Sequence, residues 1–184
     1  SIKFDPSGGA APQRRESFQA MLDDFGAGGA RGAGGEGRRQ VVLVASSHAG
    51  EEKLLASAYL KSGNEALLVV VPRHAERRAE VQADLESCGL EAVLSSAYQS
   101  PRNVAKACLV VDSTGELCDW TAHADVVVIG KSWLGTGGQN PAEAIVAGVP
   151  VITGPNMQNF EPLVGELKMA GAIRVLSSVD QLGD

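Results

Sequence analysis

A loop rich in glycine and amide side chains stands between two apolar runs in the last third of the sequence. Its glycines and polar residues are Gly135, Gly137, Gly138, Gln139, Asn140 and Glu143. Glycine lets a backbone turn tightly and lets a ligand approach it closely. Free backbone N–H groups at the start of a helix attract anions, most often phosphate. The pattern therefore predicts a phosphate-binding loop, and the structural alternative is a glycine-rich turn that binds no ligand.

The residues after these glycines carry the signals of a helix start. Asn140 is a good N-cap residue, Pro141 suits the first helical position, and Glu143 follows the cap at the spacing of a capping box. A helix is expected over Pro141–Ala147, ending at Gly148. The Glu143 carboxylate could support this helix start or accept hydrogen bonds from sugar hydroxyls, and the sequence leaves both roles open.

Other polar pairs follow other apolar runs of the chain, namely Ser47-His48, Arg73-His74 and Ser113-Thr114, and Gly154-Pro155-Asn156 follows another. In a parallel sheet the carboxyl ends of the strands lie along one edge, where open α/β sheets bind ligands. We therefore expect these side chains to gather beside the glycine loop.

Individual roles at this edge have rivals. His48 and His74 could position a ligand or cap helices. The guanidinium of Arg73 suits a phosphate or carboxylate, but an ion pair with Glu76 or Glu80 is the alternative. His123, at a predicted helix end, is expected to be structural.

Apolar periodicity supplies the elements that must position these residues. Strands are expected at Val41–Ala45, Ala66–Val71, Ala92–Leu94, Ala107–Val111, Asp125–Ile129, Val149–Thr153 and Ile173–Leu176. Helices are expected at Arg14–Phe25, Glu51–Lys61, Glu76–Ser87, Glu116–His123, Pro141–Ala147 and Asn159–Ala170. This alternation predicts an α/β fold of the Rossmann-like, three-layer α/β/α type, with a mostly parallel sheet covered on both faces.

Composition excludes several function classes. The 184 residues suit one domain, and a net charge of -6 argues against general nucleic-acid binding. The three cysteines, Cys88, Cys108 and Cys118, have no metal-ligand spacing, so we expect no metal ion or cofactor. Gly130-Lys131-Ser132 imitates the end of a P-loop, but position 125, where that motif needs glycine, is Asp.

Several motifs together resemble one enzyme family, the 3-deoxy-D-manno-octulosonic acid (Kdo) transferases of lipopolysaccharide synthesis. In chain order these motifs are Ser47-His48 with Gly50-Glu51-Glu52, V-P-R-H-x-E-R at 71–77, Asp112–Leu117, G-G-Q-N-P-x-E at 137–143, and Gly154-Pro155-Asn156 with Asn159-Phe160. Their order and spacing match as well, so the resemblance is specific.

The resemblance implies a glycosyltransferase of two Rossmann-like domains (the GT-B fold), with this chain as the C-terminal one. Residues 1–13 would be an interdomain linker, and residues 14–184 would bind the donor, CMP-Kdo, with residues 26–37 as a flexible glycine-rich loop. The implied donor-site residues are Ser47, His48, Arg73, His74, Ser113, Thr114, Gly137, Gly138, Gln139, Asn140 and Glu143. The acceptor site for a lipid A precursor, the catalytic base and the inner-membrane anchor, on the cytoplasmic side, would belong to a missing N-terminal domain, so this fragment alone would be soluble and inactive.

Two positions depart from the family pattern. The usual histidine of G-G-H-N-P is Gln139, which cannot carry charge, and the proline usual after the motif glutamate is Ala144. Two alternatives therefore stay open: a GT-B enzyme that uses a UDP-sugar, or a non-catalytic module that binds nucleotides or proteins.

Overall fold

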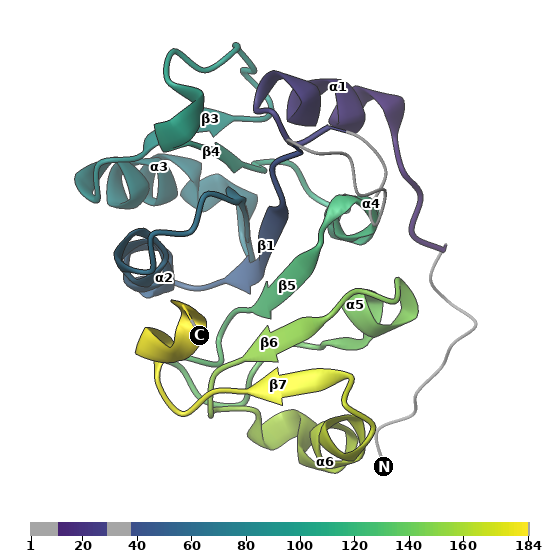
Figure 1. Ribbon diagram of the computed structural model, residues 1–184. Helices are drawn as coiled ribbons and strands as arrows, with labels where there is room; N and C mark the ends of the chain where they lie inside the picture. Colours follow the sequence, from purple (N-terminus) through teal and green to yellow (C-terminus); the bar gives the residue numbers. More distant parts are fainter. Residues whose placement is uncertain (1–10, 29–37, 184) are drawn as a thin grey trace.

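The computed structural model describes residues 11–28 and 38–183 as an α/β fold built on a seven-stranded sheet (Figure 1). All the pairings between neighbouring strands are parallel, and their order is β3-β4-β2-β1-β5-β6-β7. The strands are β1 (Val41–Ser47), β2 (Leu67–Pro72), β3 (Glu91–Leu94), β4 (Ala107–Val110), β5 (Val126–Ile129), β6 (Val151–Thr153) and β7 (Ile173–Val175). The predicted fold class is confirmed.

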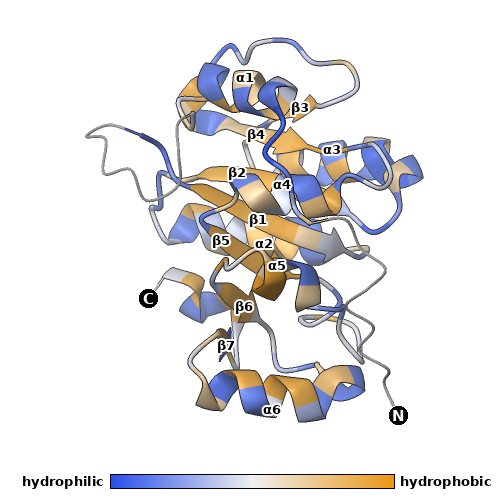
Figure 2. Ribbon diagram, turned by 90° about the vertical axis from the view of Figure 1, so that its right-hand side faces the viewer, coloured by the Kyte–Doolittle hydropathy of each residue, from blue (hydrophilic) through white to orange (hydrophobic). Residues whose placement is uncertain are grey.

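Helices cover both faces of this sheet. On one face lie α1 (Glu16–Asp24), α4 (Leu117–His123), α5 (Ala142–Val146) and α6 (Glu161–Met169). On the other lie α2 (Glu51–Lys61), α3 (Arg78–Ser87) and the 3-10 helix η4 (Val179–Gly183). The remaining 3-10 turns are η1 (Ala75–Arg77), η2 (Val104–Lys106) and η3 (Gln158–Phe160). Figure 2 shows the apolar strands as a layer between helices that are partly polar.

The strands form because their β-branched and aliphatic side chains are buried on both faces of the sheet. All six residues of β2 are buried, and Val69 and Leu109 are fully inaccessible. Burying each such side chain stabilises the fold by about 1.5–3 kcal/mol. The sheet is therefore a rigid platform for the loops that follow its strands.

The chain changes winding direction between β1 and β5, which lie side by side in the middle of the sheet. Ala45 pairs with Ile129 at the last step of this ladder. From β1 the sheet is built outward through β2 on one side and through β5 on the other. The carboxyl ends of these two strands form the switch point, where open α/β sheets bind ligands.

The element boundaries differ from the sequence predictions by a few residues. The helix Glu51–Lys61 is confirmed to the residue, whereas α5 is shorter than expected, since it covers Ala142–Val146. The helix predicted over Glu76–Ser87 begins as the 3-10 turn η1 before α3.

Most of the predicted linker and glycine-rich loop lies outside the described residues, because positions 1–10 and 29–37 are not described. Residues 11–15 have no regular secondary structure. Along the described ranges, no helix combines the length and the apolar character needed to cross a membrane. The division into linker and donor domain stays a prediction.

Candidate functional site

Polar residues from several strand ends meet at the carboxyl edge of the sheet. His48 follows β1 and His74 follows β2, and their ring centroids are 6.5 Å apart. His48 Nδ1 lies 3.1 Å from the carbonyl oxygen of Ser46, and the exposed His74 ring lies 3.8 Å from the Glu76 carboxylate. Neither ring makes a helix-capping hydrogen bond among the described residues. The capping role is therefore not seen for either ring, and their contact with a ligand stays a prediction.

Arg73 presents its guanidinium to solvent at the same edge. The ion pairs of the described residues include none with Arg73, because Glu80 pairs with Arg77 and Glu76 lies beside His74. The alternative that Arg73 is held by Glu76 or Glu80 is therefore wrong. A free arginine after a buried strand is well suited to a phosphate or carboxylate.

Arg77, by contrast, forms an ion pair with a buried carboxylate. It donates to both carboxylate oxygens of Glu52, at 2.8 and 3.3 Å, and the Glu52 side chain has no exposed surface. Ser47 is also fully buried, and its hydroxyl donates to the same carboxylate at 2.8 Å. Ser47, predicted to line the donor site, therefore has a structural partner and shows no side chain at the surface.

Glu51 is a buried residue to which the sequence analysis gave no role. Its Oε2 accepts hydrogen bonds from the backbone N–H groups of His48, at 3.0 Å, and Lys131, at 2.6 Å. Its Oε1 accepts from Trp133 at 3.1 Å and Leu134 at 3.4 Å. The carboxylate thus satisfies four N–H groups and joins the loop after β1 to the loop after β5.

Two residues of these loops adopt the left-handed backbone conformation that favours glycine. Ser46 has φ 57° and Lys131 has φ 55°, and they are the described non-glycine residues with positive φ. Such a conformation costs about 1–2 kcal/mol for an L-residue. Both lie at the switch point, where backbone strain often accompanies function.

The glycine loop after β5 is shaped chiefly by its own protein neighbours. Gly137 and Gly138 have φ 94° and 72°, and both are buried. A Cβ atom on Gly137 would lie 2.5 Å from Asn159 Nδ2, and one on Gly138 would lie 2.4 Å from Met157 Sδ. The space beside their α-carbons is therefore filled by the segment after β6, and contact of a ligand with the backbone of Gly137 and Gly138 stays a prediction.

The start of α5, which follows this loop, matches the predicted capping only in part. Asn140 Oδ1 accepts a 3.0 Å hydrogen bond from Ala142 N–H, although α5 begins one residue later than predicted and has Pro141 at its N-cap position. The reciprocal capping-box bond from Glu143 is absent among the hydrogen bonds of the described residues, and the Glu143 side chain reaches the surface. Partial burial raises the pKa of Glu143. Its carboxylate is thus free of the helix cap and open to a ligand.

Backbone N–H groups of this loop differ in their availability. The Gly137 N–H donates to Gln158 Oε1 at 2.8 Å. Within the described ranges, no hydrogen bond involves the N–H groups of Gly138, Gln139 or Asn140. Free N–H donors therefore lie directly before α5, and the partly exposed Gln139 lies among them.

The residues after β4 contribute less to an open site. The Ser113 hydroxyl donates to the Glu116 carboxylate, and Thr114 is exposed. Asp112 is buried and accepts hydrogen bonds from Ser95 and Ser96. Burial alone would raise the pKa of Asp112, but these hydrogen bonds outweigh it and leave the pKa below its usual value. Asp112 therefore joins two strand ends.

His123 has the structural role that the sequence predicted. It is fully buried, and its Nε2 accepts a 3.1 Å hydrogen bond from the backbone N–H of Arg15. Burial lowers the pKa of His123 to about 4. The neutral ring therefore joins α4 to the segment before α1.

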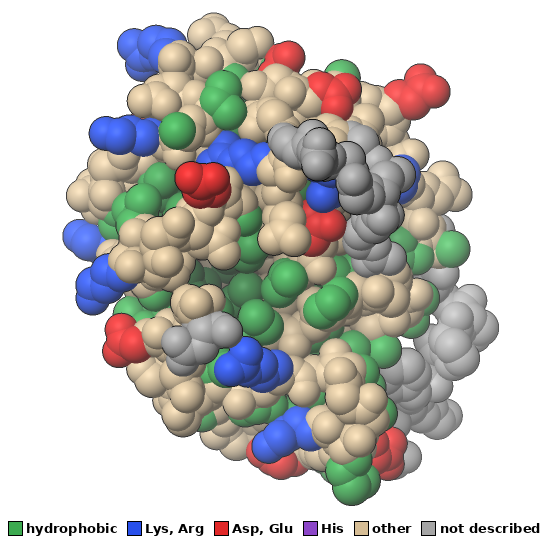
Figure 3. Space-filling model, viewed as in Figure 1, with side chains coloured by type: hydrophobic (Ala, Val, Ile, Leu, Met, Phe, Trp, Pro, Cys, Tyr) green, Lys and Arg blue, Asp and Glu red, His purple; other side chains and the backbone are tan. Residues whose placement is uncertain are grey.

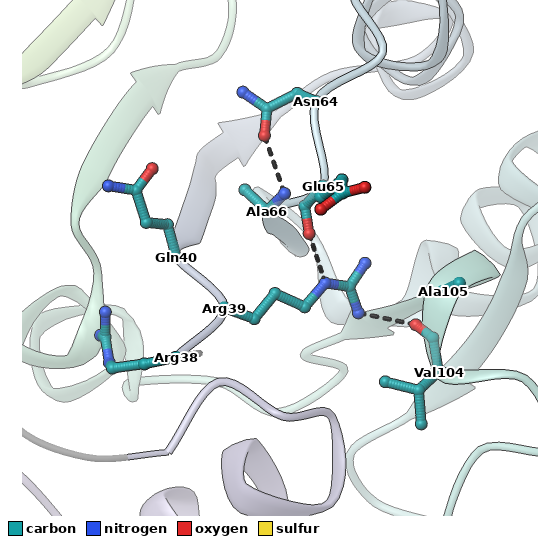
Figure 4. Close-up of a pocket in the computed structure, with 8 residues that line it drawn as sticks. All are labelled: Arg38, Arg39, Gln40, Asn64, Glu65, Ala66, Val104 and Ala105. Atoms are coloured by element: carbon teal, nitrogen blue, oxygen red, sulfur yellow. Dashed lines mark hydrogen bonds between the residues drawn. The ribbon is translucent and has the colours of Figure 1, made fainter. Parts of the chain in front are cut away.

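The opposite edge of the sheet carries a depression lined by Arg38, Arg39, Gln40, Asn64, Glu65, Ala66, Val104 and Ala105 (Figure 4). Arg39 is already occupied there, because it donates to the carbonyl oxygens of Glu65, at 2.6 Å, and Val104, at 2.7 Å. This depression lies at the amino ends of the strands, where an α/β sheet does not bind its ligands.

Another cavity, of about 130 Å³, lies between α2 and the sheet and is lined mainly by apolar side chains. Figure 3 likewise shows apolar side chains gathered in a hollow on one face, with charged side chains around them. Across residues 11–28 and 38–183, no group of three His, Cys, Asp or Glu side chains is placed to hold a metal ion. That a polar, anionic ligand binds at the carboxyl edge stays a prediction.

Comparison with known proteins finds relatives of one enzyme family. No protein-family model matches the chain. It is 36% identical to the 3-deoxy-D-manno-octulosonic acid transferase of Bordetella pertussis over an alignment of 146 positions that covers 76% of this chain and 34% of that protein. It is 30% identical to the probable mitochondrial 3-deoxy-D-manno-octulosonic acid transferase of Arabidopsis thaliana, over 74% of this chain and 31% of that protein. The chain thus spans about a third of the length of these relatives.

A solved structure matches more completely. The C-terminal CMP-Kdo binding domain of WaaA from Acinetobacter baumannii superposes with a TM-score of 0.69 and 35% sequence identity. The match covers 78% of this chain and 76% of that domain. The similarity therefore extends over most of the domain in both proteins.

Proposed function

Since the chain belongs to the 3-deoxy-D-manno-octulosonic acid (Kdo) transferases, we propose that it corresponds to their C-terminal domain and binds the nucleotide sugar CMP-Kdo. It would act as the donor domain of a glycosyltransferase that transfers Kdo to a lipid A precursor. One observation supports this most: Arg73, the His48–His74 pair and the free N–H groups before α5 lie at one edge of a parallel sheet.

The chemistry of the donor gives these groups distinct roles. Transfer breaks the bond between the anomeric carbon of Kdo and a phosphate oxygen, and CMP leaves with the electron pair. Arg73 and the N–H groups of Gly138–Asn140 would stabilise the charge that develops on this phosphate. The Glu143 carboxylate, which makes no capping-box bond, would accept hydrogen bonds from the ribose hydroxyls.

The rest of the reaction is assigned to the part of the relatives that this chain does not span. The lipid A precursor, the general base and the membrane attachment at the cytoplasmic face would belong to that N-terminal part. Among the described carboxylates of the donor edge, Glu51, Glu52 and Asp112 are buried and hydrogen-bonded, and we assign the open Glu143 to the ribose rather than to proton transfer. We therefore expect this chain alone to bind the donor without transferring Kdo.

Chemical-shift mapping with CMP tests the donor site. We expect perturbed amides in residues 46–51, 72–77 and 130–143, with smaller changes elsewhere. Perturbations confined to the depression around Arg39 would contradict the proposal. UMP and UDP provide the comparison, since tighter binding of UDP would favour an enzyme that uses a UDP-sugar.

A transfer assay with CMP-Kdo and a lipid A precursor tests the enzyme. Turnover is expected from the full-length protein and not from this chain. Activity in neither protein would favour a non-catalytic module and would direct attention to Gln139, where the family has histidine.

A further inference from the structure

Lys131 stands in the left-handed backbone conformation immediately after Gly130, which follows β5, at the switch point of the sheet. Few L-residues occupy this conformation without a cause, and Lys has no side-chain group that stabilises it locally. Strained residues of this kind cluster at active sites and ligand-binding sites. A role for the Lys131 side chain at this edge would account for the conformation.

The backbone of Lys131 is held in place by a buried group. Its N–H donates to Glu51 Oε2 at 2.6 Å, and the same oxygen accepts from His48 N–H at 3.0 Å. The carboxylate also accepts from Trp133 N–H two residues further on. These bonds use the backbone, so they hold the backbone of Lys131 in place without neutralising its ammonium group.

The side chain itself lies along the glycine loop. Its Cγ would be 3.1 Å from a Cβ atom on Gly135, and the residue is partly exposed. Among the ion pairs and hydrogen bonds of the described residues, none involves the ammonium of Lys131. The stem thus follows the loop, and the charge stays available at an edge whose neighbouring carboxylates, Glu51 and Glu52, are already bonded.

We propose that Lys131 is a binding residue for an anionic group of the nucleotide-sugar donor, with Glu51 as the residue that positions it. This inference rests on the proposed function and adds a cation from the loop after β5 to the Arg73 guanidinium from the loop after β2. A donor that carries both a phosphate and a sugar carboxylate offers two anionic groups, and a cation at each suits such a ligand. In this proposal the incomplete P-loop signature at Gly130-Lys131-Ser132 supplies a lysine for an anion, although the rest of that motif is missing.

Calorimetric titration of the 184-residue chain with cytidine, CMP and CMP-Kdo tests the proposal. Lys131→Met removes the charge and keeps most of the stem. We expect it to weaken binding of CMP or CMP-Kdo by about fivefold or more, to leave cytidine unchanged, and to reduce the salt dependence of binding. Lys131→Arg should restore most of the loss. The difference between cytidine and CMP reports the phosphate, and that between CMP and CMP-Kdo reports the sugar acid.

Two further variants separate charge from structure. Lys106→Met removes one charge at the opposite edge and should bind all three ligands as the unchanged chain does. Lys131→Gly accepts the left-handed conformation without strain, so it should fold and still show the same loss of affinity. The proposal is overturned if Lys131→Met and Lys131→Gly bind CMP and CMP-Kdo within twofold of the unchanged chain. Failure of the unchanged chain to bind any of the three ligands would instead overturn the proposed function.

Discussion

The carboxylate of Glu51, at the start of α2, accepts a 2.6 Å hydrogen bond from the backbone N–H of Lys131, which lies 80 residues further along the chain. This bond connects the loops that follow β1 and β5, the two strands at the switch point. A fully buried carboxylate therefore holds together two loops of the proposed donor site.

Replacing Glu51 with Gln should destabilise the chain strongly. The amide has one acceptor oxygen instead of two, and its NH₂ group would face N–H donors that now bond to the carboxylate. The loss of two hydrogen bonds to a charged group predicts a decrease of about 3 kcal/mol in the free energy of unfolding. Urea unfolding measures it, and Glu166→Gln on the exposed face of α6 is the control. A change below about 1 kcal/mol would contradict this role for Glu51.

Arg73 and Arg77 should separate binding from stability, although they stand four residues apart. Arg73→Met should leave the free energy of unfolding almost unchanged and weaken CMP binding by about tenfold, because the guanidinium has no partner in the described structure. Arg77→Met should cost about 3–5 kcal/mol, because it leaves the buried Glu52 carboxylate unpaired. Unfolding and calorimetric titration of both variants provide the test. The reverse pattern would exchange their assigned roles.

The sequence predicts most of this fold because its signals are local. Valine-rich runs mark buried strands, and glycine or asparagine marks where helices begin and end, so both can be recognised within about ten residues. The gathering of His48, Arg73 and His74 could also be predicted, since it follows from the parallel arrangement of the strands alone.

The roles of Glu51 and the glycines could not be predicted because they depend on distant contacts. Two acids in the first turn of a helix usually indicate a solvated helix start. Glu51 is instead a buried acceptor, because β5 lies beside β1 and brings the loop after β5 next to the start of α2. Likewise, Gly138 suits a ligand-binding loop in the sequence, yet Met157 occupies the space beside it. Ser47 likewise follows a strand end in the sequence, which suggests a donor-site residue, yet its hydroxyl bonds to the buried Glu52.

Alanine at Gly138 should be much more costly than alanine at Gly171. Both glycines have similar left-handed φ angles, 72° and 70°, so the backbone strain is matched at about 1–2 kcal/mol. A Cβ atom meets Met157 Sδ at 2.4 Å at the first position and nothing within 4 Å at the second. Overpacking should add about 1–3 kcal/mol for Gly138→Ala. Equal unfolding free energies would show that the loop moves away from Met157 without cost.

The buried His123 should make the chain less stable in mild acid. Burial lowers its pKa from 6.5 to about 4, so the unfolded chain binds a proton more readily than the folded chain between these values. Stability should therefore be lost as the pH falls from about 6.5 towards 4, by up to about 3 kcal/mol. In urea unfolding across this range, His123→Gln should show a shallower pH slope, because Gln can still accept the Arg15 N–H. An unchanged slope would assign the acid sensitivity to other groups.

Glu143 tests whether the edge binds a ribose. Partial burial raises the pKa of this carboxylate, so its ionised form is less favourable in the folded chain, and stability from this group falls as the pH rises above its unfolded pKa. Glu143→Gln removes that charge, and the variant keeps the Asn140 cap. The free energy of unfolding at pH 7 should therefore stay equal or rise slightly. Binding of CMP should weaken by about tenfold, because a carboxylate that accepts from two ribose hydroxyls makes stronger hydrogen bonds than an amide. Deoxycytidine monophosphate lacks the 2′-hydroxyl but keeps the 3′-hydroxyl, so the variant should lose less affinity for it than for CMP. A variant that binds CMP as tightly as the unchanged chain would leave Glu143 without a role in the donor site.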